Sequence, residues 1–318
     1  MKNIKLNQKM NCFICRKGNP KDYGNNNHFD RRKSLEGSWD IYKCDNCGIR
    51  SIHPKPSLKE LSKYYQIYYK DSNLEIKSGF GSKNDYLRKI YHFFNGEVDP
   101  RNFIRKDPNK VMLDFGYGGG TFLKYFHDSG CNIYGAEAND VAVEAGIKAG
   151  LKVKKIESFE EIPYENQKFD IVYLMQVFEH LSNPRIFLPE LNRVLKNDGE
   201  LYLALPNAKS IWKNIFKKNW VVWFPPFHIA HYDANILRNL SEEFGFKYET
   251  HWSKTPENWL RFSLKALIYK NNNNLEETST FLDSKLSRVC TMIISMFFNI
   301  FAKENDCIMI KLKKVNDV

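Results

Sequence analysis

The sequence predicts an α/β fold in which helices cover both faces of a largely parallel β-sheet. Between residues 110 and 247, short apolar runs of strand length alternate with amphipathic segments of helical period. This alternation is typical of parallel strands joined by crossover helices. Several of these runs end in glycine or polar residues. Ligands of such sheets bind beyond the carboxyl ends of the strands, so we expect the functional site at that edge.

The turn after the first predicted strand, residues 111–113, carries the clearest motif. Asp114 is followed by glycines at alternate positions, Gly116, Gly118 and Gly120. Glycine lets the backbone approach a ligand closely and adopt a positive φ, and the helix that follows offers free N–H groups to an anionic part of a ligand. The turn is therefore a candidate nucleotide site.

An acidic residue ends the second predicted strand. The apolar run 131–136 leads into Glu137, and a carboxylate at this place can accept hydrogen bonds from both hydroxyls of a nucleotide ribose. Ser158 follows the third predicted strand, and Gln176 follows the apolar run 169–175 of the fourth. These residues should gather at one edge of the sheet.

In this order the motifs resemble those of class I methyltransferases, which use S-adenosylmethionine. The resemblance covers residues 110–247 and implies a Rossmann-like, seven-stranded methyltransferase sheet. It implies an enzyme that binds S-adenosylmethionine through Asp114, Gly116, Gly118, Gly120, Glu137, Ser158 and Gln176.

Two Cys-x-x-Cys pairs near the N-terminus predict a metal site. Cys12 and Cys15 form the first pair, and Cys44 and Cys47 form the second. Four thiolates at this spacing can surround one tetrahedral zinc ion, whereas four unrelated cysteines would not be paired in this way. A segment this small buries too little surface to fold alone. We therefore expect a structural zinc ribbon over residues 1–57.

A helical connector is expected over residues 58–109, beginning with a tyrosine-rich segment (Tyr64, Tyr65, Tyr68 and Tyr69). Two cysteine pairs, a Pro-x-Pro-Ser turn and such a segment before a methyltransferase domain resemble bacterial sugar C-methyltransferases and related surface-polysaccharide enzymes. The resemblance implies a sugar acceptor, either nucleotide-linked or lipid-linked. The chain is shorter than the C-methyltransferases, which favours methylation at oxygen. The tyrosines lie near the cofactor or acceptor, or they pack the ribbon onto the main domain.

Methylation of a hydroxyl usually needs a general base, and histidine is the natural base near neutral pH. His228 follows two prolines in a loop and is our first candidate. His180, with Glu179, follows the fourth strand and is the second; capping and loop packing are the alternative for this pair. His231 is a further candidate, or it belongs to a helix start capped by Asp233.

Glu179 and His180 also resemble part of the Glu-x-x-Glu-His motif of ubiquinone-type O-methyltransferases. In that motif the acids and the histidine can hold a divalent cation, but Gln176 replaces the first acid here. Three tryptophans between residues 210 and 223 form an acceptor wall or belong to the core; they are Trp212, Trp220 and Trp223.

The predicted methyltransferase core ends at residue 252, and a helical insertion, residues 253–304, precedes a closing strand and tail, 305–318. Residues 289–301 are almost continuously apolar but too few for a membrane span, which needs about 20. Flanking Lys285, Arg288 and Lys303 suit a helix that lies in a membrane interface over residues 286–302. The alternative is a lid helix packed on the sheet.

The net charge of +11 favours anionic partners: nucleic acid, acidic lipid or phosphorylated substrates. The ribbon shows no stripe of lysine and arginine with interleaved aromatics, so nucleic acid is not the expected partner. An RNA methyltransferase and a non-catalytic scaffold are the alternative functions. Seven cysteines, four of them in pairs, and no apolar signal segment at the start predict a cytoplasmic protein, peripheral to the membrane if residues 286–302 bind lipid.

Overall fold

The computed structural model describes residues 11–33, 35–57, 60–61, 63–65, 74–79, 84–158, 161–269 and 274–315. The strands are β1 (Pro20–His28), β2 (Trp39–Cys44), β3 (Arg50–His53), β4 (Val111–Phe115), β5 (Asn132–Glu137), β6 (Lys152–Lys155), β7 (Phe169–Met175), β8 (Leu195–Pro206), β9 (Ala230–His231), β10 (Phe246–Lys254) and β11 (Cys307–Lys314). The α-helices are α2 (Asp85–Asn95), α3 (Thr121–Asp128), α4 (Asp140–Lys148), α5 (Pro184–Val194), α6 (Ile211–Phe216), α7 (Ala234–Glu242), α8 (Glu257–Ile268) and α9 (Lys285–Phe301). Short 3-10 helices span Pro100–Asn102, Phe178–His180, Lys217–Asn219, Val221–Trp223 and Phe281–Asp283.

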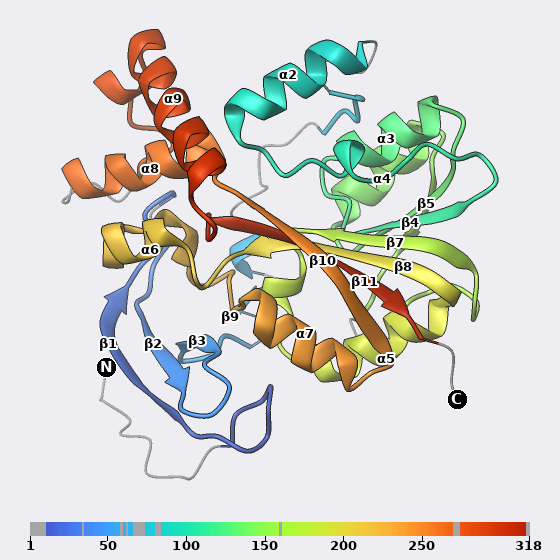
Figure 1. Cartoon of the computed structure of the whole chain (residues 1–318), viewed down its shortest axis with the longest axis horizontal. Coiled ribbons are helices and arrows are strands. Elements are labelled where there is room, and N and C mark those ends of the chain that lie inside the picture. Colours follow the sequence, from blue (N-terminus) through green and yellow to red (C-terminus); the bar gives the residue numbers. More distant parts are fainter. Residues whose placement is uncertain are drawn as a thin grey trace.

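The central sheet has seven strands in the order β10-β11-β8-β7-β4-β5-β6 (Figure 1). The five strands from β8 to β6 pair in parallel, and β11 lies antiparallel between β8 and β10. This arrangement confirms the predicted α/β fold class. The order of the strands places the carboxyl ends of β4, β5, β7 and β8 along one edge, where the predicted motifs lie.

Neighbouring residues of β4 serve the two faces of the sheet. Met112 packs in a cluster with Leu123 and Phe126 of α3, whereas Leu113 packs in a second cluster with Phe187 of α5. Successive side chains of a strand point to opposite faces, so an entirely apolar strand must be covered twice. The apolar character of β4 therefore follows from burial on both sides.

A second sheet, in the order β1-β2-β3-β9, joins the N-terminal segment to the main domain. β9 pairs antiparallel with β3, opposing Arg50 to His231 and Ser51 to Ala230. The side chains between the two parts form one cluster made of Trp39, Ile41 and Ile52 with Trp212, Trp220 and Trp223. The last three are at most 6% exposed, so they are core residues and not an acceptor wall.

The C-terminal insertion places α8 and α9 between β10 and β11, and α9 lies beside α2 and α8 (Figure 1). The buried side chains of α9 are polar, Thr291 and Ser295, while its large apolar side chains are mostly exposed. A lid helix that buries its apolar face on the sheet is therefore not what the structure shows. In the described part of the chain, we find no helix with the length and apolar character needed to cross a membrane.

In the described part of the connector, α2 (Asp85–Asn95) begins where the Asn84 side chain accepts from the N–H groups of Tyr86 and Leu87. It ends at Gly96, which has a φ of 65°. Tyr68 and Tyr69 lie outside the described residues.

Candidate functional site

In the glycine turn after β4, two of the glycines pack against protein side chains and one faces open space. Gly116, Gly118 and Gly120 all have positive φ, at 72°, 49° and 66°. A Cβ on Gly116 would lie 2.5 Å from the Val177 side chain, and one on Gly120 would lie 2.7 Å from Ile76. A Cβ on Gly118 would meet nothing within 4 Å. The backbone at Gly118 can therefore be approached closely by a ligand.

Glu137, at the end of β5, holds the turn through its side chain. Its Oε2 accepts from the N–H of Gly118 at 2.8 Å, and its Oε1 accepts from the N–H groups of Ala138 and Asn139. Its backbone carbonyl accepts from Ile156, 2.9 Å away, two residues before the exposed Ser158. The predicted cofactor residues after β4, β5 and β6 thus lie beside one another.

Asp114 is buried beneath this turn. Its side chain is 2% exposed, and no described residue hydrogen-bonds to its Oδ2. Burial, with a smaller contribution from the charge of Glu137, raises the pKa of Asp114 to about 8. A cationic ligand that donates to this oxygen would relieve the cost of the buried carboxylate. The open turn and this oxygen fit S-adenosylmethionine, which carries cationic sulfonium and ammonium groups.

The chain bends sharply where β7 ends. Gln176 has a φ of 56°, which is uncommon and costly for a residue other than glycine. Its N–H donates to Ala204 of β8 at 2.7 Å, and its side-chain amide donates to the Cys307 sulfur at 3.4 Å. The next residue, Val177, contacts Gly116 of the glycine turn. This contact makes the exit of β7 a direct neighbour of the predicted cofactor site.

Glu179 and two histidines form a buried cluster just beyond that contact. Glu179 is fully buried, and neither carboxyl oxygen receives a hydrogen bond from a described residue. Its Oε1 lies 4.0 Å from the Nε2 of His180 and 3.8 Å from the Nε2 of His228. The two imidazole rings are 5.0 Å apart, centre to centre. The fold therefore brings together three of the four predicted catalytic residues.

Backbone carbonyls select the tautomer of both histidines. The Nδ1 of His180 lies 2.9 Å from the carbonyl of Phe227, and the Nδ1 of His228 lies 2.8 Å from that of Val222. A carbonyl only accepts, so each Nδ1 carries the proton and each Nε2 presents a lone pair toward Glu179.

Burial keeps this cluster uncharged near neutral pH. It lowers the pKa of His180 to about 4 and the pKa of His228 well below its usual value, because an imidazolium is poorly solvated inside the protein. It raises the pKa of Glu179 to about 8 for the corresponding reason. Two neutral imidazoles with free lone pairs are thus available.

The cluster could act on a ligand in two ways. The three ligand atoms lie within 4.8 Å of one another and could hold a divalent cation, and a backbone partner on the other ring nitrogen is common among metal-binding histidines. Tetrahedral zinc with bonds of about 2.1 Å separates its ligands by about 3.4 Å, so the observed 3.8 and 4.0 Å would have to shorten. Accepting a proton from a hydroxyl needs no such closure.

His231 is not part of this cluster. It is fully buried in β9, with its ring 4.8 Å from that of Trp223, inside the core between the two sheets. Asp233 accepts from the N–H groups of Asn235 and Ile236 and caps α7. The structure therefore places His231 with the core and with a helix start, and not beside Glu179.

The tyrosine-rich segment divides between the two expected roles. Tyr65 lies against the cluster, with its hydroxyl 3.2 Å from the Nδ1 of His180 and its ring 4.9 Å from that of Phe227. Tyr64 instead donates to the carbonyl of Glu36 and packs its ring near Trp39 of the ribbon. One tyrosine serves the site, and its neighbour serves the attachment of the ribbon.

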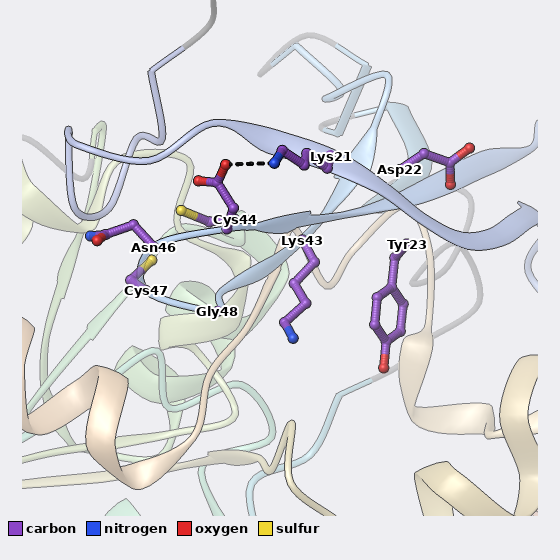
Figure 2. Close-up of a pocket in the computed structure, with 9 residues that line it drawn as sticks. Lys21, Asp22, Tyr23, Lys43, Cys44, Asn46, Cys47 and Gly48 are labelled. Atoms are coloured by element: carbon purple, nitrogen blue, oxygen red, sulfur yellow. Dashed lines mark ion pairs between the residues drawn. The ribbon is translucent and has the colours of Figure 1, made fainter.

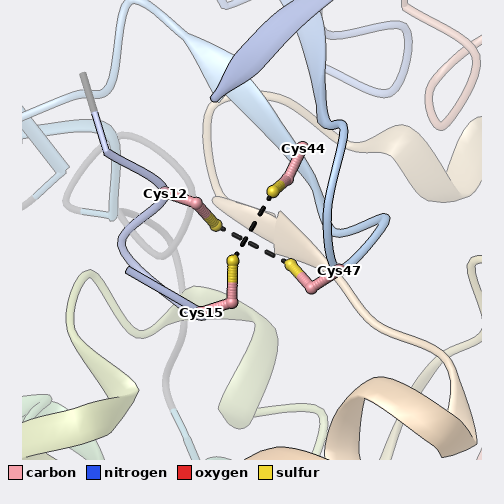
Figure 3. Close-up of side chains that lie close together, drawn as sticks. All are labelled: Cys12, Cys15, Cys44 and Cys47. Atoms are coloured by element: carbon pink, nitrogen blue, oxygen red, sulfur yellow. Dashed lines mark hydrogen bonds between the residues drawn. The ribbon is translucent and has the colours of Figure 1, made fainter. Parts of the chain in front are cut away.

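The four ribbon cysteines converge on one point (Figure 3). The sulfurs of Cys12 and Cys47 are 3.7 Å apart, as are those of Cys15 and Cys44, and all four lie within 4.8 Å of one another. Zinc–sulfur bonds of about 2.3 Å at tetrahedral angles give a separation of about 3.8 Å, whereas a disulfide needs about 2.05 Å. The cluster could therefore bind zinc.

An open hollow of about 390 Å³ lies on the ribbon itself (Figure 2). Lys21, Asp22, Tyr23 and Lys43 line it together with residues 44–48. Lys21 is paired with Asp45 at 3.0 Å, so the charges of the lining are mixed. Since all of its lining residues belong to the ribbon, the hollow is separate from the glycine turn.

Two contributors to the site escaped the sequence analysis. Ile76 of the connector contacts Gly120, but an isolated apolar residue in a polar stretch gives no signal of its role. The pairing of Ala230 and His231 with β3 was also missed. The apolar pair Ile229 and Ala230 between two histidines was its only trace, and a strand of two residues is too short to be recognised.

Comparison with known proteins adds a family and several relatives. Residues 86–251, more than half of the chain, match the family model described as "Methyltransferase domain". A ubiquinone biosynthesis O-methyltransferase of Pelagibacter ubique is 27% identical over 155 residues, covering 47% of this chain and 65% of that protein. The Bartonella tribocorum protein of the same name is 31% identical over 134 residues, covering 40% and 52%. The chain thus spans about half to two thirds of the length of these relatives.

Similar solved structures have low sequence identity. A SAM-dependent methyltransferase from Archaeoglobus fulgidus is 16% identical with a TM-score of 0.46, covering 80% of this chain and 99% of that one. A SAM-dependent methyltransferase from Aquifex aeolicus is 16% identical with a TM-score of 0.44, covering 74% and 100%.

Proposed function

The chain belongs to the methyltransferase-domain family and is an S-adenosylmethionine-dependent methyltransferase, and from this we propose that it methylates a hydroxyl oxygen of a sugar. One observation carries the proposal of an oxygen acceptor. The neutral His228, with its Nε2 unprotonated, lies 3.8 Å from Glu179, and Glu179 comes two residues after Val177, which contacts the glycine turn. A base that removes a proton from a hydroxyl belongs at such a place.

In the proposed reaction the acceptor hydroxyl donates to the Nε2 of His228. S-adenosylmethionine would supply the methyl group when bound: the acceptor oxygen would gain the bond to the methyl carbon, and the electron pair of the broken carbon–sulfur bond would stay on the sulfur. The hydroxyl proton passes to His228. Glu179, 3.8 Å away, would stabilise the protonated base in molecules whose Glu179 carboxyl is already ionised, and because its pKa is raised to about 8 this fraction grows as the pH rises.

Asp114, the glycine turn and Glu137 would hold the cofactor, with Ser158 and Gln176 beside it. His180 is the alternative base, because its Nε2 also lies near Glu179. His228 remains our first candidate, since His180 is additionally engaged by the Tyr65 hydroxyl. Substitution of each histidine in turn separates these roles.

The sugar acceptor is supported by the arrangement of the chain around the site. The ribbon and tyrosine-rich segment that resemble those of bacterial sugar methyltransferases lie against the candidate base: β3 pairs with the strand that follows His228, and Tyr65 contacts His180. We also propose that the four cysteines bind a structural zinc ion with no open position for catalysis.

A phenolic hydroxyl is the second candidate acceptor. The relatives named as ubiquinone biosynthesis O-methyltransferases favour it, although this chain matches only part of their length. Both candidates use the same base and the same transfer to oxygen, and they differ only in the molecule that brings the hydroxyl.

Labelled S-adenosylmethionine and fractions of a cell extract test the proposal. The purified protein would be incubated with nucleotide sugars, lipid-linked glycans, lipid-soluble phenols and RNA in turn. Label in a sugar fraction, lost with His228→Asn, supports the proposal. Label in the phenol fraction makes the second candidate correct, and label in RNA contradicts both. Label on carbon or nitrogen of any acceptor contradicts the role of the base.

A further inference from the structure

Helix α9 carries its polar residues on its inner face. Thr291, Ser295 and Asn299 recur every four residues and therefore share one face. The Thr291 hydroxyl donates to the Glu257 carboxylate at 2.6 Å, and the Ser295 hydroxyl donates to the carbonyl of Thr255 at 2.5 Å. Asn299 accepts from the N–H of Thr255 at 2.6 Å. Hydrogen bonds to the start of α8 thus fix the orientation of α9.

The outer face of the same helix is apolar and exposed. The side chains on it are between 42% and 75% exposed; they are Leu286, Val289, Ile293, Ile294, Phe297, Ile300 and Phe301. A surface helix of a water-soluble protein normally turns such a face toward the core. Helix α9 therefore exposes its apolar face and buries its polar face, which is the reverse of the usual arrangement in water.

Helix α2, beside α9, extends this surface (Figure 1). Its exposed apolar and aromatic side chains are Tyr86, Leu87, Ile90, Tyr91, Phe93 and Phe94. Because α2 lies beside α9, we consider the exposed apolar side chains of the two helices together and call them the α2–α9 face. Clustered exposed apolar side chains of this extent mark a site of interaction and are not expected of an isolated surface.

The basic residues around the α2–α9 face indicate which kind of partner would bind there. Lys285, Arg288 and Lys303 flank α9, and Lys89 lies on α2; all four are exposed. None forms an ion pair with a described side chain, and the sequence of α9 contains no acidic residue. A second copy would bring the same cations to this face, whereas a surface with negative charge would pair with them.

We propose that the α2–α9 face docks the protein onto a membrane surface that contains anionic lipid. Interfacial helices combine an inserted apolar face with flanking basic residues, and tyrosines such as Tyr86 and Tyr91 suit the headgroup region. The 17 residues of α9 extend about 25 Å. Bound to the protein along its whole inner face, α9 would lie in the plane of the membrane.

Docking would also bring the site toward the lipid. Thr255, which α9 binds, accepts from the N–H of Asp306 through its hydroxyl, and Asn207 at the end of β8 donates to the carbonyl of Asn305. These contacts join the α2–α9 face to the carboxyl edge of the sheet. The proposal goes beyond the proposed function and holds for any acceptor.

Vesicle binding by the full chain tests the proposal. Phosphatidylcholine vesicles with and without phosphatidylglycerol would be floated with the wild type and two variants. The first, Ile293→Ser with Phe297→Ser, should bind about 100-fold more weakly because it removes inserted apolar area. The second, Lys285→Glu with Arg288→Glu, should bind at least about 20-fold more weakly to the anionic vesicles. High salt should weaken the binding of the wild type to these vesicles in the same way.

Matched controls come from α4, on another part of the molecule. Ile147→Ser changes a side chain that is 62% exposed, and Lys148→Glu changes an exposed cation. Both should bind vesicles as the wild type does, and all variants should keep their affinity for S-adenosylhomocysteine. Absence of binding to anionic vesicles, or equal binding by α9 variants and controls, overturns the proposal. So does a dimer, seen by sedimentation, that Ile293→Ser with Phe297→Ser dissociates while vesicle binding is absent.

Discussion

The two halves of the sheet edge are built in different ways. The proposed cofactor half, at the ends of β4, β5 and β6, is made from consecutive elements, and the Glu137 carboxylate holds the glycine turn by accepting from the backbone N–H of Gly118. The acceptor half, at the ends of β7 and β8, is assembled from separate parts of the chain. Glu179 and His228 meet there because the loop before β9 is hydrogen-bonded to the exit of β7, through the Ile229 N–H and the Glu179 carbonyl, and Tyr65 lies against His180.

Because of this difference, the two halves should tolerate different substitutions. Backbone groups in a turn recognise a ligand that is the same throughout a family, and they leave few side chains to vary. Side chains brought from distant segments can be exchanged without disturbing the sheet. We therefore expect that changes in the acceptor half abolish transfer and spare cofactor binding, whereas changes in the glycine turn weaken cofactor binding.

Loss of the proposed ribbon zinc should have the largest effect. Structural zinc contributes about 10–16 kcal/mol to folding of small domains, so Cys12→Ser with Cys47→Ser should unfold the ribbon and release β9. Transfer should fall to background, whereas affinity for S-adenosylhomocysteine should change little, as measured by calorimetry. Cys290→Ser, at an exposed position of α9, is the matched control. Loss of cofactor binding in the double variant would show that the two halves are not independent.

Substitution of the proposed base comes next. His228→Asn keeps a donor for the Val222 carbonyl but has no basic nitrogen, so kcat should fall by about 10²–10⁴-fold with unchanged cofactor affinity. His180→Asn in parallel identifies which histidine matters more, and His251→Asn, exposed on β10, is the control. Near-normal turnover by His228→Asn would refute its assignment.

The buried carboxyl of Glu179 should make stability depend on pH. Burial raises its pKa from an ordinary value of 4.5 to about 8, so the folded protein binds more protons than the unfolded chain between these values. The free energy of unfolding should therefore fall as pH rises through this window. Glu179→Gln removes the penalty and should be more stable than the wild type by about 4 kcal/mol at pH 8 and nearly equal at pH 4.5. Denaturant unfolding at both pH values measures this.

A bound divalent cation would reverse that result. The metal would stabilise the Glu179 carboxylate, so Glu179→Gln would then be the less stable protein at pH 8, and the wild type would gain stability when the ion is added. The same experiment thus separates a proton-accepting cluster from a metal centre.

The smallest effect is expected in the glycine turn. Gly118 and Gly130 both have positive φ, 49° and 81°, and a Cβ on either meets nothing within 4 Å. Substitution by alanine should cost each about 1 kcal/mol in stability. Only Gly118→Ala should weaken the binding of S-adenosylhomocysteine, by about tenfold, because its Cβ occupies space reserved for the ligand. Equal affinities of the two variants would place the cofactor elsewhere.

The sequence was most informative where neighbours in the chain are neighbours in space. The glycine turn and Glu137 lie on successive elements, so their spacing along the chain was enough to predict that they lie close together. The sequence placed Glu179 and His228 after different strands and could not bring them together, since a loop's path depends on long-range packing. The polarity of α9 was hidden for a related reason. Thr291 and Ser295 lie within an apolar run, and only the contacts with α8 reveal that they face inward.

The pairing of β3 with β9 has a consequence for the order in which the protein is made. The ribbon is synthesised before β9, so its sheet lacks its last strand until Ala230 and His231 have been made. At about 5–20 residues per second, the chain between these strands takes on the order of ten seconds or more to appear. During that time the β3 edge can pair with other chains. Early capture of metal by the four cysteines would hold the nascent ribbon in a defined shape while it waits for its closing strand.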